Sequence, residues 1–504
     1  MSARRSTRRD FLKWTGSVAA TAWEAQRLPG AESLASSRPN IVVILADDLG
    51  WGSLNCYGAP PNLVRTPNCD RLAREGIRFT DANTASSVCS PTRYALLTGR
   101  YCWRTSLQHE VLGTMAPLHI ETSRLTMASL LKKRGYRTAA VGKWHLGYGS
   151  SPKCDYTAEL TPGPLDIGFD YHFAVPSNHG DNTGVFVENR RVLGLRSNKL
   201  DPSKYGKTFY GGGSFLGLDA PQRMDEDVMG TLTRKAVAWL DQQEAGRPFF
   251  LYFTPVAVHR PVTPSAKTKG GSAAGPYGDW IHELDASVGG ILDALDRKGL
   301  GKDTLVVFTS DNGGVIVPPA QADSPEGQAA KAGLVINGPW RARKHSVYQG
   351  GFRVPFLARW PGRIPAGATC DETISLTDLL ATTAALVGEP LPARTVAAED
   401  SCNVLPALLG KRPDHPIRDA MVGHSADGNF AIRQGPWKWI EGKAHPATLP
   451  GALKARAVEF KPQLYNLAED PAEKTDVLDK YPEVAKRLEA LLNQYREQGF
   501  SRPQ

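Results

Sequence analysis

Four short apolar runs constrain the fold of this chain more than any other feature of its 504-residue sequence. They occupy residues 40–46, 137–141, 248–254 and 304–310, and their apolar residues follow one another without regular polar alternation. Runs of this kind are typical of strands buried on both faces, as in a parallel sheet covered by helices. The sequence therefore predicts an α/β fold.

Segments with apolar positions at helical spacing are interspersed among these runs, over residues 68–76, 123–134, 225–244 and 277–298. Alternating strands and helices favour a doubly wound sheet. After Gly410 the pattern changes to short strand-like pieces, followed by a predicted closing helix over residues 482–498. We therefore expect a large domain over residues 36–412 and a smaller α+β domain over 413–504.

Polar residues follow each of the four runs: Asp47 and Asp48, Lys143 and His145, His259, and Asp311 and Asn312. Ligands of open α/β sheets bind outside the carboxyl ends of the strands, so we expect these side chains to share one pocket. Lys143 and His145 are two residues apart, and in an extended segment both side chains would point the same way.

The acidic and amide members of this set supply only oxygen ligands, which suit a hard cation such as calcium or magnesium. Either pair alone, Asp47–Asp48 or Asp311–Asn312, could simply form a turn. Together at strand ends they indicate one shared metal ion. None of the seven cysteines forms a Cys-x-x-Cys pair, which argues against a zinc ribbon.

The segment from Val88 to Arg100 predicts a helix that begins close to Cys89, because small and polar residues precede Cys89 and good helix formers follow Pro91. Arg93 would lie one helical turn later on the same face. Unpaired amides at a helix start favour a thiolate or a bound oxyanion. A lone Cys-x-Pro is more often a half-buried cysteine before a turn.

The first 35 residues resemble a twin-arginine export signal. Residues 6–13 read Ser-Thr-Arg-Arg-Asp-Phe-Leu-Lys, and an apolar stretch over 14–23 and small residues over 33–35 follow. We expect export to the periplasm or the exterior, with a disordered basic tail as the alternative. The apolar stretch is too short for a permanent membrane anchor. The net charge is +9, of which the first 35 residues contribute +3 through six Arg or Lys and three Asp or Glu. The mildly basic remainder suits a polyanionic substrate and does not by itself indicate nucleic acid.

Read in order, the motifs resemble those of the type I sulfatases, in which a cysteine is oxidised to formylglycine. The resemblance extends from about Pro39 to Lys480 and implies an alkaline-phosphatase-like mixed sheet sandwiched by helices, with a smaller C-terminal sheet domain. The matching segments are residues 46–50, 66–68, 89–93, 142–147, 259–261, 310–314, the loop around Lys344, and 464–467.

The resemblance also assigns roles. Cys89 would be converted to formylglycine by a formylglycine-generating enzyme, and the hydrated aldehyde would attack sulfur. Calcium, rather than magnesium, would be held by Asp47, Asp48, Cys89, Asp311 and Asn312. Arg93, Lys143 and Lys344 would neutralise charge on the sulfate and the formylglycine. His145 would assist sulfate release and His259 would protonate the leaving alcohol. The substrate would be a sulfated carbohydrate or an aryl sulfate.

Departures from the family pattern are confined to the loop around Lys344. Gln349 occupies a position where the family often has Glu, and Arg-Ala-Arg precedes Lys344 where the family more usually has a glycine-rich sequence. Phosphonate and phosphate ester hydrolases of the same superfamily commonly have His at the position of Asn312, so Asn312 favours sulfate. A non-catalytic binder of sulfated glycans is the third hypothesis.

Overall fold

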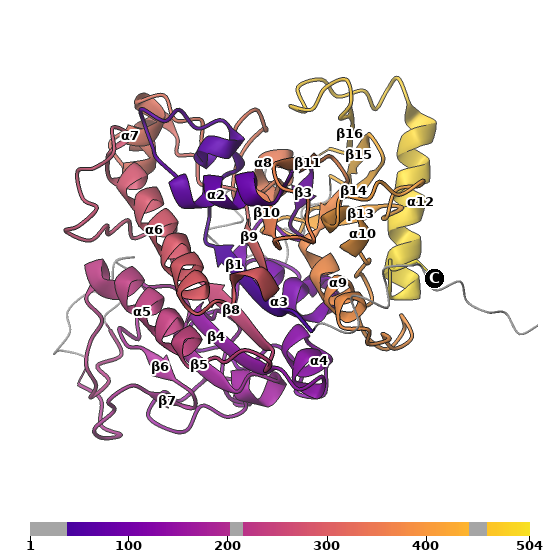
Figure 1. Ribbon diagram of the computed structural model, residues 1–504. Helices are drawn as coiled ribbons and strands as arrows, with labels where there is room; N and C mark the ends of the chain where they lie inside the picture. The colour runs from indigo at the N-terminus through magenta and orange to yellow at the C-terminus, as the bar shows by residue number, and fades with distance from the viewer. Residues whose placement is uncertain (1–37, 202–214, 443–460, 504) are drawn as a thin grey trace, which may run out of the picture. The chain divides into compact units, whose positions relative to one another are not determined.

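A mixed sheet of ten strands organises the computed structural model, which describes residues 38–201, 215–442 and 461–503 (Figure 1). The predicted signal segment lies outside the described residues. The strand order is β11-β2-β10-β9-β1-β8-β4-β5-β6-β7. Within the described residues, no helix is both long enough and apolar enough to cross a bilayer.

The four predicted strands form the centre of this sheet and are parallel to one another: β1 (Asn40–Ala46), β8 (Phe249–Thr254), β9 (Thr304–Ser310) and β4 (Arg137–Lys143). Strand β1 lies between β8 and β9, with Ile44 opposite Phe253 and Phe308. Because the four strands run in the same direction, the polar residues that follow them emerge at one edge of the sheet.

The outer strands make the sheet mixed, in agreement with the fold that the family resemblance implied. Strand β10 (Phe356–Arg359) is antiparallel to β9 and to β2 (Ile77–Phe79), which is parallel to β11 (Ala368–Cys370). On the other side β5 (Tyr171–Val175) is parallel to β4, and β6 (Val187–Glu188) and β7 (Arg191–Val192) follow as antiparallel strands. A separate parallel pair joins β3 (Ala82–Asn83) to β12 (Ile374–Ser375).

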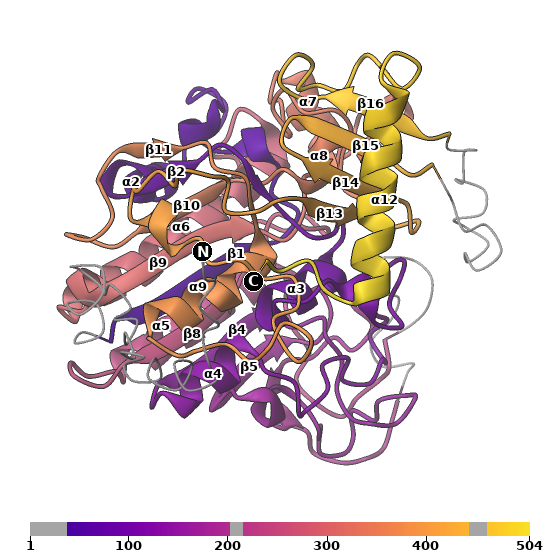
Figure 2. The same cartoon turned by 90° about the vertical axis from the view of Figure 1, so that its right-hand side faces the viewer.

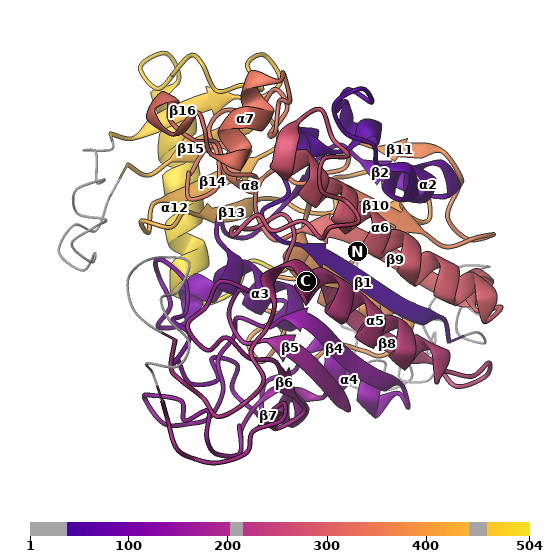
Figure 3. The ribbon, with the colours of Figure 1, turned by 90° about the vertical axis from the view of Figure 1, so that its left-hand side faces the viewer.

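Helices cover both faces of the sheet. Figure 3 shows α5 (Val228–Asp241) and α6 (Gly275–Arg297) in front of β1 and β8, and Figure 2 shows α4 (Met127–Lys133) and α9 (Leu379–Leu386) over the opposite face. The remaining helices are α2 (Pro67–Glu75), α3 (Cys89–Thr98), α7 (Pro325–Lys331), α8 (Gln349–Phe352), α10 (Leu405–Leu408) and α12 (Pro482–Gln498).

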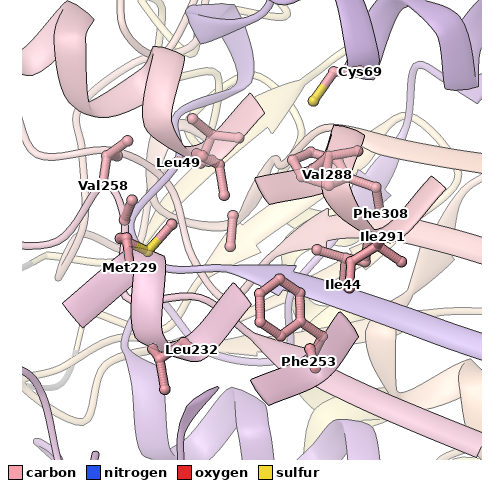
Figure 4. Close-up of a cluster of buried hydrophobic side chains, with 14 of the residues drawn as sticks. Ile44, Leu49, Cys69, Met229, Leu232, Phe253, Val258, Val288, Ile291 and Phe308 are labelled. Atoms are coloured by element: carbon pink, nitrogen blue, oxygen red, sulfur yellow. The ribbon is translucent and has the colours of Figure 1, made fainter. Parts of the chain in front are cut away.

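The core beneath α5 and α6 is built from alternate residues of the central strands (Figure 4). Ile44 and Phe253 face Leu232 of α5 and Ile291 of α6, and all four side chains are fully buried. Burying each of these side chains contributes about 1.5–3 kcal/mol. This packing fixes the strands, and thereby the positions of the residues at their ends.

A second sheet follows near the C-terminus, as the sequence predicted. It is antiparallel, with the order β13 (Met421–His424), β14 (Phe430–Gln434), β15 (Trp437–Ile440) and β16 (Gln463–Asn466). Helix α12 has the predicted bounds and shares a core with this sheet through Leu488 and Leu492. The domain boundary near residue 412 stays a prediction.

The predicted helices over 68–76 and 277–298 are shifted by one or two residues in the structure, and two others become α-helical three or four residues later than predicted. Helix α4 begins at Met127 instead of residue 123, because the Thr126 hydroxyl caps it by accepting a hydrogen bond from the Ser129 amide. The segment predicted as helix over 225–244 begins as a 3-10 turn, Asp225–Asp227, and becomes α-helical only at Val228.

Candidate active site

The ends of β1 and β9 bring two pairs of polar residues together. Ala46 lies opposite Ser310 in the parallel register, so Asp48 and Asp311 follow on neighbouring strands. The Asp48 amide donates to Asp311 Oδ1 at 3.1 Å, and Asn312 Nδ2 donates to Asp48 Oδ1 at 2.8 Å. Asp48 has a left-handed backbone, with φ 60°. All of these side chains are buried, so the two strand ends form one polar cluster in the interior.

Cys89 is the first residue of α3, as predicted, and its thiol points into this cluster. Its Sγ lies 3.8 Å from Asp47 Oδ1, 3.4 Å from Lys143 Nζ and 3.6 Å from Lys344 Nζ. Burial raises the pKa of the Cys89 thiol to about 12, an effect that the two lysines oppose only in part. The expectation that the helix start stabilises a thiolate is therefore wrong for the unmodified cysteine, because desolvation outweighs it.

Arg93 connects the helix to two strand ends. Its Nε and Nη2 donate to Asp311 Oδ2 at 3.1 and 2.7 Å, and its Nη1 donates to the backbone carbonyl of Lys143 at 2.9 Å. The side chain is fully buried, and Nη2 also lies 3.6 Å from Asp47 Oδ1. Arg93 therefore fixes α3, β4 and β9 relative to one another through charged hydrogen bonds.

Two lysines from separate segments neutralise the paired aspartates. Lys143, the last residue of β4, donates to Asp47 Oδ1 and Oδ2 at 3.0 and 2.8 Å. Lys344 Nζ lies 2.8 Å from Asp48 Oδ1 and 2.9 Å from Oδ2. Burial raises the pKa of Asp47 to about 7, although Lys143 favours its charged form. Lys143 therefore compensates the burial of Asp47 only in part. At Asp48 burial is outweighed by the nearby positive charges, Lys344 first, which hold the pKa of that carboxyl below its usual value.

The two histidines lie at the border of the cluster. His259 Nε2 is 3.8 Å from Asp48 Oδ2, and its Nδ1 is 2.6 Å from the carbonyl of Arg260. His145 Nε2 is 3.0 Å from the carbonyl of Leu112, while its Nδ1 is buried without a hydrogen-bond partner. Burial, and then the charges of nearby lysines, hold the pKa of both imidazoles well below the usual value.

One geometric expectation about these residues is wrong. Lys143 and His145 do not lie on one continuous extended segment, because β4 ends at Lys143 and His145 has a left-handed φ of 55°. The two side chains nevertheless lie close enough for the charge of Lys143 to lower the pKa of His145.

The loops that carry Asn312 and Lys344 make close backbone contact. Gly313 donates to the carbonyl of Gly351 at 3.0 Å, and the Lys344 amide donates to the carbonyl of Gly314 at 3.1 Å. A Cβ atom at Gly313 would lie 1.8 Å from the carbonyl oxygen of Gly350, so only glycine allows this approach. The glycines of both loops therefore place Lys344 beside Asp48.

The donor set fits a hard divalent cation. Asp47, Asp48, Cys89 and His259 each place one possible ligand atom within 4.8 Å of the others, and Asn312 Oδ1 is buried without a partner. Carboxylate and amide oxygens predominate, which suits calcium or magnesium. The sequence named His259 only as a proton donor, and its place in the ligand cluster emerges from the structure. The sequence did not predict the contact between His145 and the Leu112 carbonyl, because a backbone contact does not depend on the type of side chain at that position.

Comparison with known proteins identifies the family. The family model described as Sulfatase matches residues 39–389, more than half of the chain. The chain belongs to the sulfatase family. This sulfatase is 38% identical to an N-acetylgalactosamine-6-O-sulfatase of Bacteroides thetaiotaomicron, covering 91% of this chain and 93% of the relative. It is 36% identical to human arylsulfatase A, covering 92% and 88% of the two chains. Membership makes the protein a sulfuric ester hydrolase.

Solved structures agree with this assignment. A structure from work on glycosaminoglycan metabolism by Bacteroides thetaiotaomicron matches with a TM-score of 0.82 and 36% identity, over 92% of this sulfatase and 100% of that chain. A phosphonate monoester hydrolase of Agrobacterium radiobacter matches with a TM-score of 0.57 and 18% identity, over 92% and 96% of the chains. That second likeness concerns the fold alone, so the reaction class rests on the closer relatives.

Proposed function

We propose that this sulfatase hydrolyses sulfate monoesters on a sulfated carbohydrate, using a formylglycine made from Cys89 and a bound calcium ion. The observation that carries the proposal is the setting of Cys89, a buried thiol within 4 Å of Asp47, Lys143 and Lys344. With a pKa of about 12, the thiol itself is a poor nucleophile at neutral pH. Oxidation to an aldehyde by a formylglycine-generating enzyme removes this obstacle.

The formylglycine supplies, as its hydrate, a hydroxyl that attacks sulfur and a second hydroxyl that permits sulfate release. The chain's own cations bind the sulfate. Lys143 and Lys344 approach the Cys89 side chain from two segments, and Arg93 donates to Asp311 at the end of β9. Preorganised donors of this kind each contribute about 3–4 kcal/mol to a transition state.

Calcium, preferred here over magnesium, would be held by Asp47, Asp48, Asp311 and Asn312 together with the residue at position 89. The ion would supply polarisation of the sulfate oxygens. The unpartnered Oδ1 of Asn312 and the clustered ligand atoms of Asp47, Asp48 and Cys89 support this set. Asp311 is included on the family resemblance, because in the structure its two oxygens accept hydrogen bonds from the Asp48 amide and from Arg93. His259 Nε2 lies 3.8 Å from Asp48 Oδ2 at the border of this set and is not counted among its ligands.

The hydrogen-bond partners of the histidines define which nitrogen handles a proton. His145 donates from Nε2 to the Leu112 carbonyl, which leaves the buried Nδ1 as a proton acceptor. His259 donates from Nδ1 to the Arg260 carbonyl, which leaves Nε2 to take up and deliver a proton. We assign His145 to deprotonation of the hydrate and His259 to protonation of the leaving sugar oxygen.

The substrate class follows from relatives and charge. The bacterial relative named above is an N-acetylgalactosamine-6-O-sulfatase, and the net charge of +6 that remains without the first 35 residues favours an anionic glycan. A 6-O-sulfated amino sugar is therefore the first compound to assay. Export through the twin-arginine route would place the enzyme in the periplasm or outside the cell, where sulfated glycans are met.

Two measurements test this proposal together. Protein co-produced with a formylglycine-generating enzyme should show an aldehyde at Cys89 by peptide mass spectrometry, and should release sulfate from an aryl sulfate. Cys89→Ala should abolish release. Cys102→Ala, at a buried cysteine outside the cluster, should retain it.

Each other outcome has a distinct meaning. Full activity from protein with an unmodified Cys89 would refute the formylglycine mechanism. Preference for an aryl phosphate would favour a phosphonate or phosphate ester hydrolase. Binding of sulfated glycans without turnover of either ester would favour a non-catalytic binder.

A further inference from the structure

Glu473 is a fully buried carboxylate that none of the steps above uses. It follows β16 in a turn and has a left-handed φ of 53°. Its Oε1 accepts from Lys438 Nζ at 2.6 Å, and its Oε2 accepts from the Gln349 amide at 2.6 Å. The side chains of Glu473 and Lys438 are only 0% and 3% exposed, so this pair is shielded from water.

Both hydrogen-bond partners of Glu473 belong to or contact one segment, residues 347–349. Lys438 Nζ also donates to the carbonyl of Val347 at 2.8 Å, so the ion pair holds this segment at a carbonyl and at an amide. Between these points the ring of Tyr348 lies 3.7 Å from the guanidinium of Arg341, and Arg341 donates to the carbonyl of Glu473. Lys438 of the C-terminal sheet and Glu473, which follows it, therefore bind the loop of residues 341–349 at both of its ends, Arg341 and Gln349.

This loop carries Lys344 in a backbone conformation that needs outside support. Ala342 and His345 flank Lys344 with φ values of 64° and 76°, which non-glycine residues rarely adopt. Such conformations persist where surrounding contacts over-determine them. Lys344 itself makes tight contacts that depend on this conformation, with Nζ 2.8 Å from Asp48 and 3.6 Å from Cys89 Sγ.

We propose that Glu473 is a positioning residue for Lys344, so that the C-terminal sheet forms part of the sulfate-binding site. The proposal rests on the role given to Lys344 in the proposed function. Glu473 acts through the loop backbone, by fixing Val347 and Gln349, and it touches neither the substrate nor the reacting atoms. The predicted domain boundary near residue 412 would then separate two parts that build one site.

Glu473→Gln tests the proposal, because it keeps the shape of the side chain and weakens its hold on Lys438. The matched control is Glu441→Gln, which removes a bidentate ion pair with Arg496 from the same sheet, away from the loop. On aryl sulfate we expect Glu473→Gln to lower kcat/KM by about 10²-fold, and Glu441→Gln to leave it within about twofold.

A double-mutant cycle separates positioning from general destabilisation. In a Lys344→Ala background, Glu473→Gln should change kcat/KM by no more than about twofold, because the positioned group is gone. An equal loss in both backgrounds would overturn the proposal. If Glu473→Gln does not fold, Gln349→Pro replaces it, since proline at the first position of α8 deletes the amide that Glu473 binds. Its control is Gln349→Ala, which keeps that amide and removes the side chain that accepts from Arg353 Nε at 3.2 Å.

Hydrogen exchange keeps this result distinct from the fate of the proposed function. Glu473→Gln should raise amide exchange in residues 341–349 more than Glu441→Gln does. Unchanged exchange would overturn the inference whatever the activity. Faster exchange together with no sulfate release from the wild type would refute the proposed function and leave the structural role of Glu473 established.

Discussion

Replacing Arg93 by lysine should destabilise the protein far more than a conservative change of charge would imply. Arg93 makes three charged hydrogen bonds, two to Asp311 and one to the Lys143 carbonyl, from a fully buried position. A lysine keeps the charge, but its single ammonium replaces at most one of them. Since at least two bonds are lost and each contributes about 1.5–3 kcal/mol, we expect the free energy of unfolding to fall by about 3–6 kcal/mol.

Urea denaturation followed by tryptophan fluorescence measures this loss, with calcium held constant. Arg71→Lys is the matched control, because Arg71 pairs with Glu75 and Asp296 but its side chain is 24% exposed. Exposed pairs of this kind contribute below about 1 kcal/mol. Equal losses in the two variants would refute the reasoning. Sulfate release by Arg93→Lys should fall about 10²–10³-fold.

Three further predictions concern pH, metal and core. Burial lowers the pKa of His172 from 6.5 to about 3. At a pH between these values His172 is therefore neutral in the folded protein and protonated in the unfolded chain. Between pH 6.5 and about 3, His172 by itself should lower the free energy of unfolding by up to about 1.4 kcal/mol per pH unit as the pH falls. His172→Gln should remove this part of the slope in urea titrations, while other buried histidines such as His424 keep theirs. Chelation with EDTA should lower the melting temperature and calcium should restore it, except in Asp48→Asn. Phe253→Ala, in the core beneath α5, should cost about 3–5 kcal/mol by calorimetry.

The sequence alone determined the elements with strong local signals. The runs over 40–46 and 304–310 became strands with those bounds, and the helix over 482–498 did likewise. Hydrophobic periodicity depends only on residues that are close in the sequence, so it can be recognised without knowledge of the tertiary structure. For the same reason, polar residues directly after these strands could be assigned to one edge of the sheet.

The tertiary structure alone decided the chemical state of the site. A helix start favours a thiolate at Cys89, yet burial raises its pKa to about 12. Likewise the left-handed backbone of His145 breaks the extended geometry that its spacing from Lys143 predicted. Desolvation and charge act through space, so no local pattern reports them. The hold of Glu473 on Gln349, 124 residues away in the chain, could be seen only when both segments were folded together.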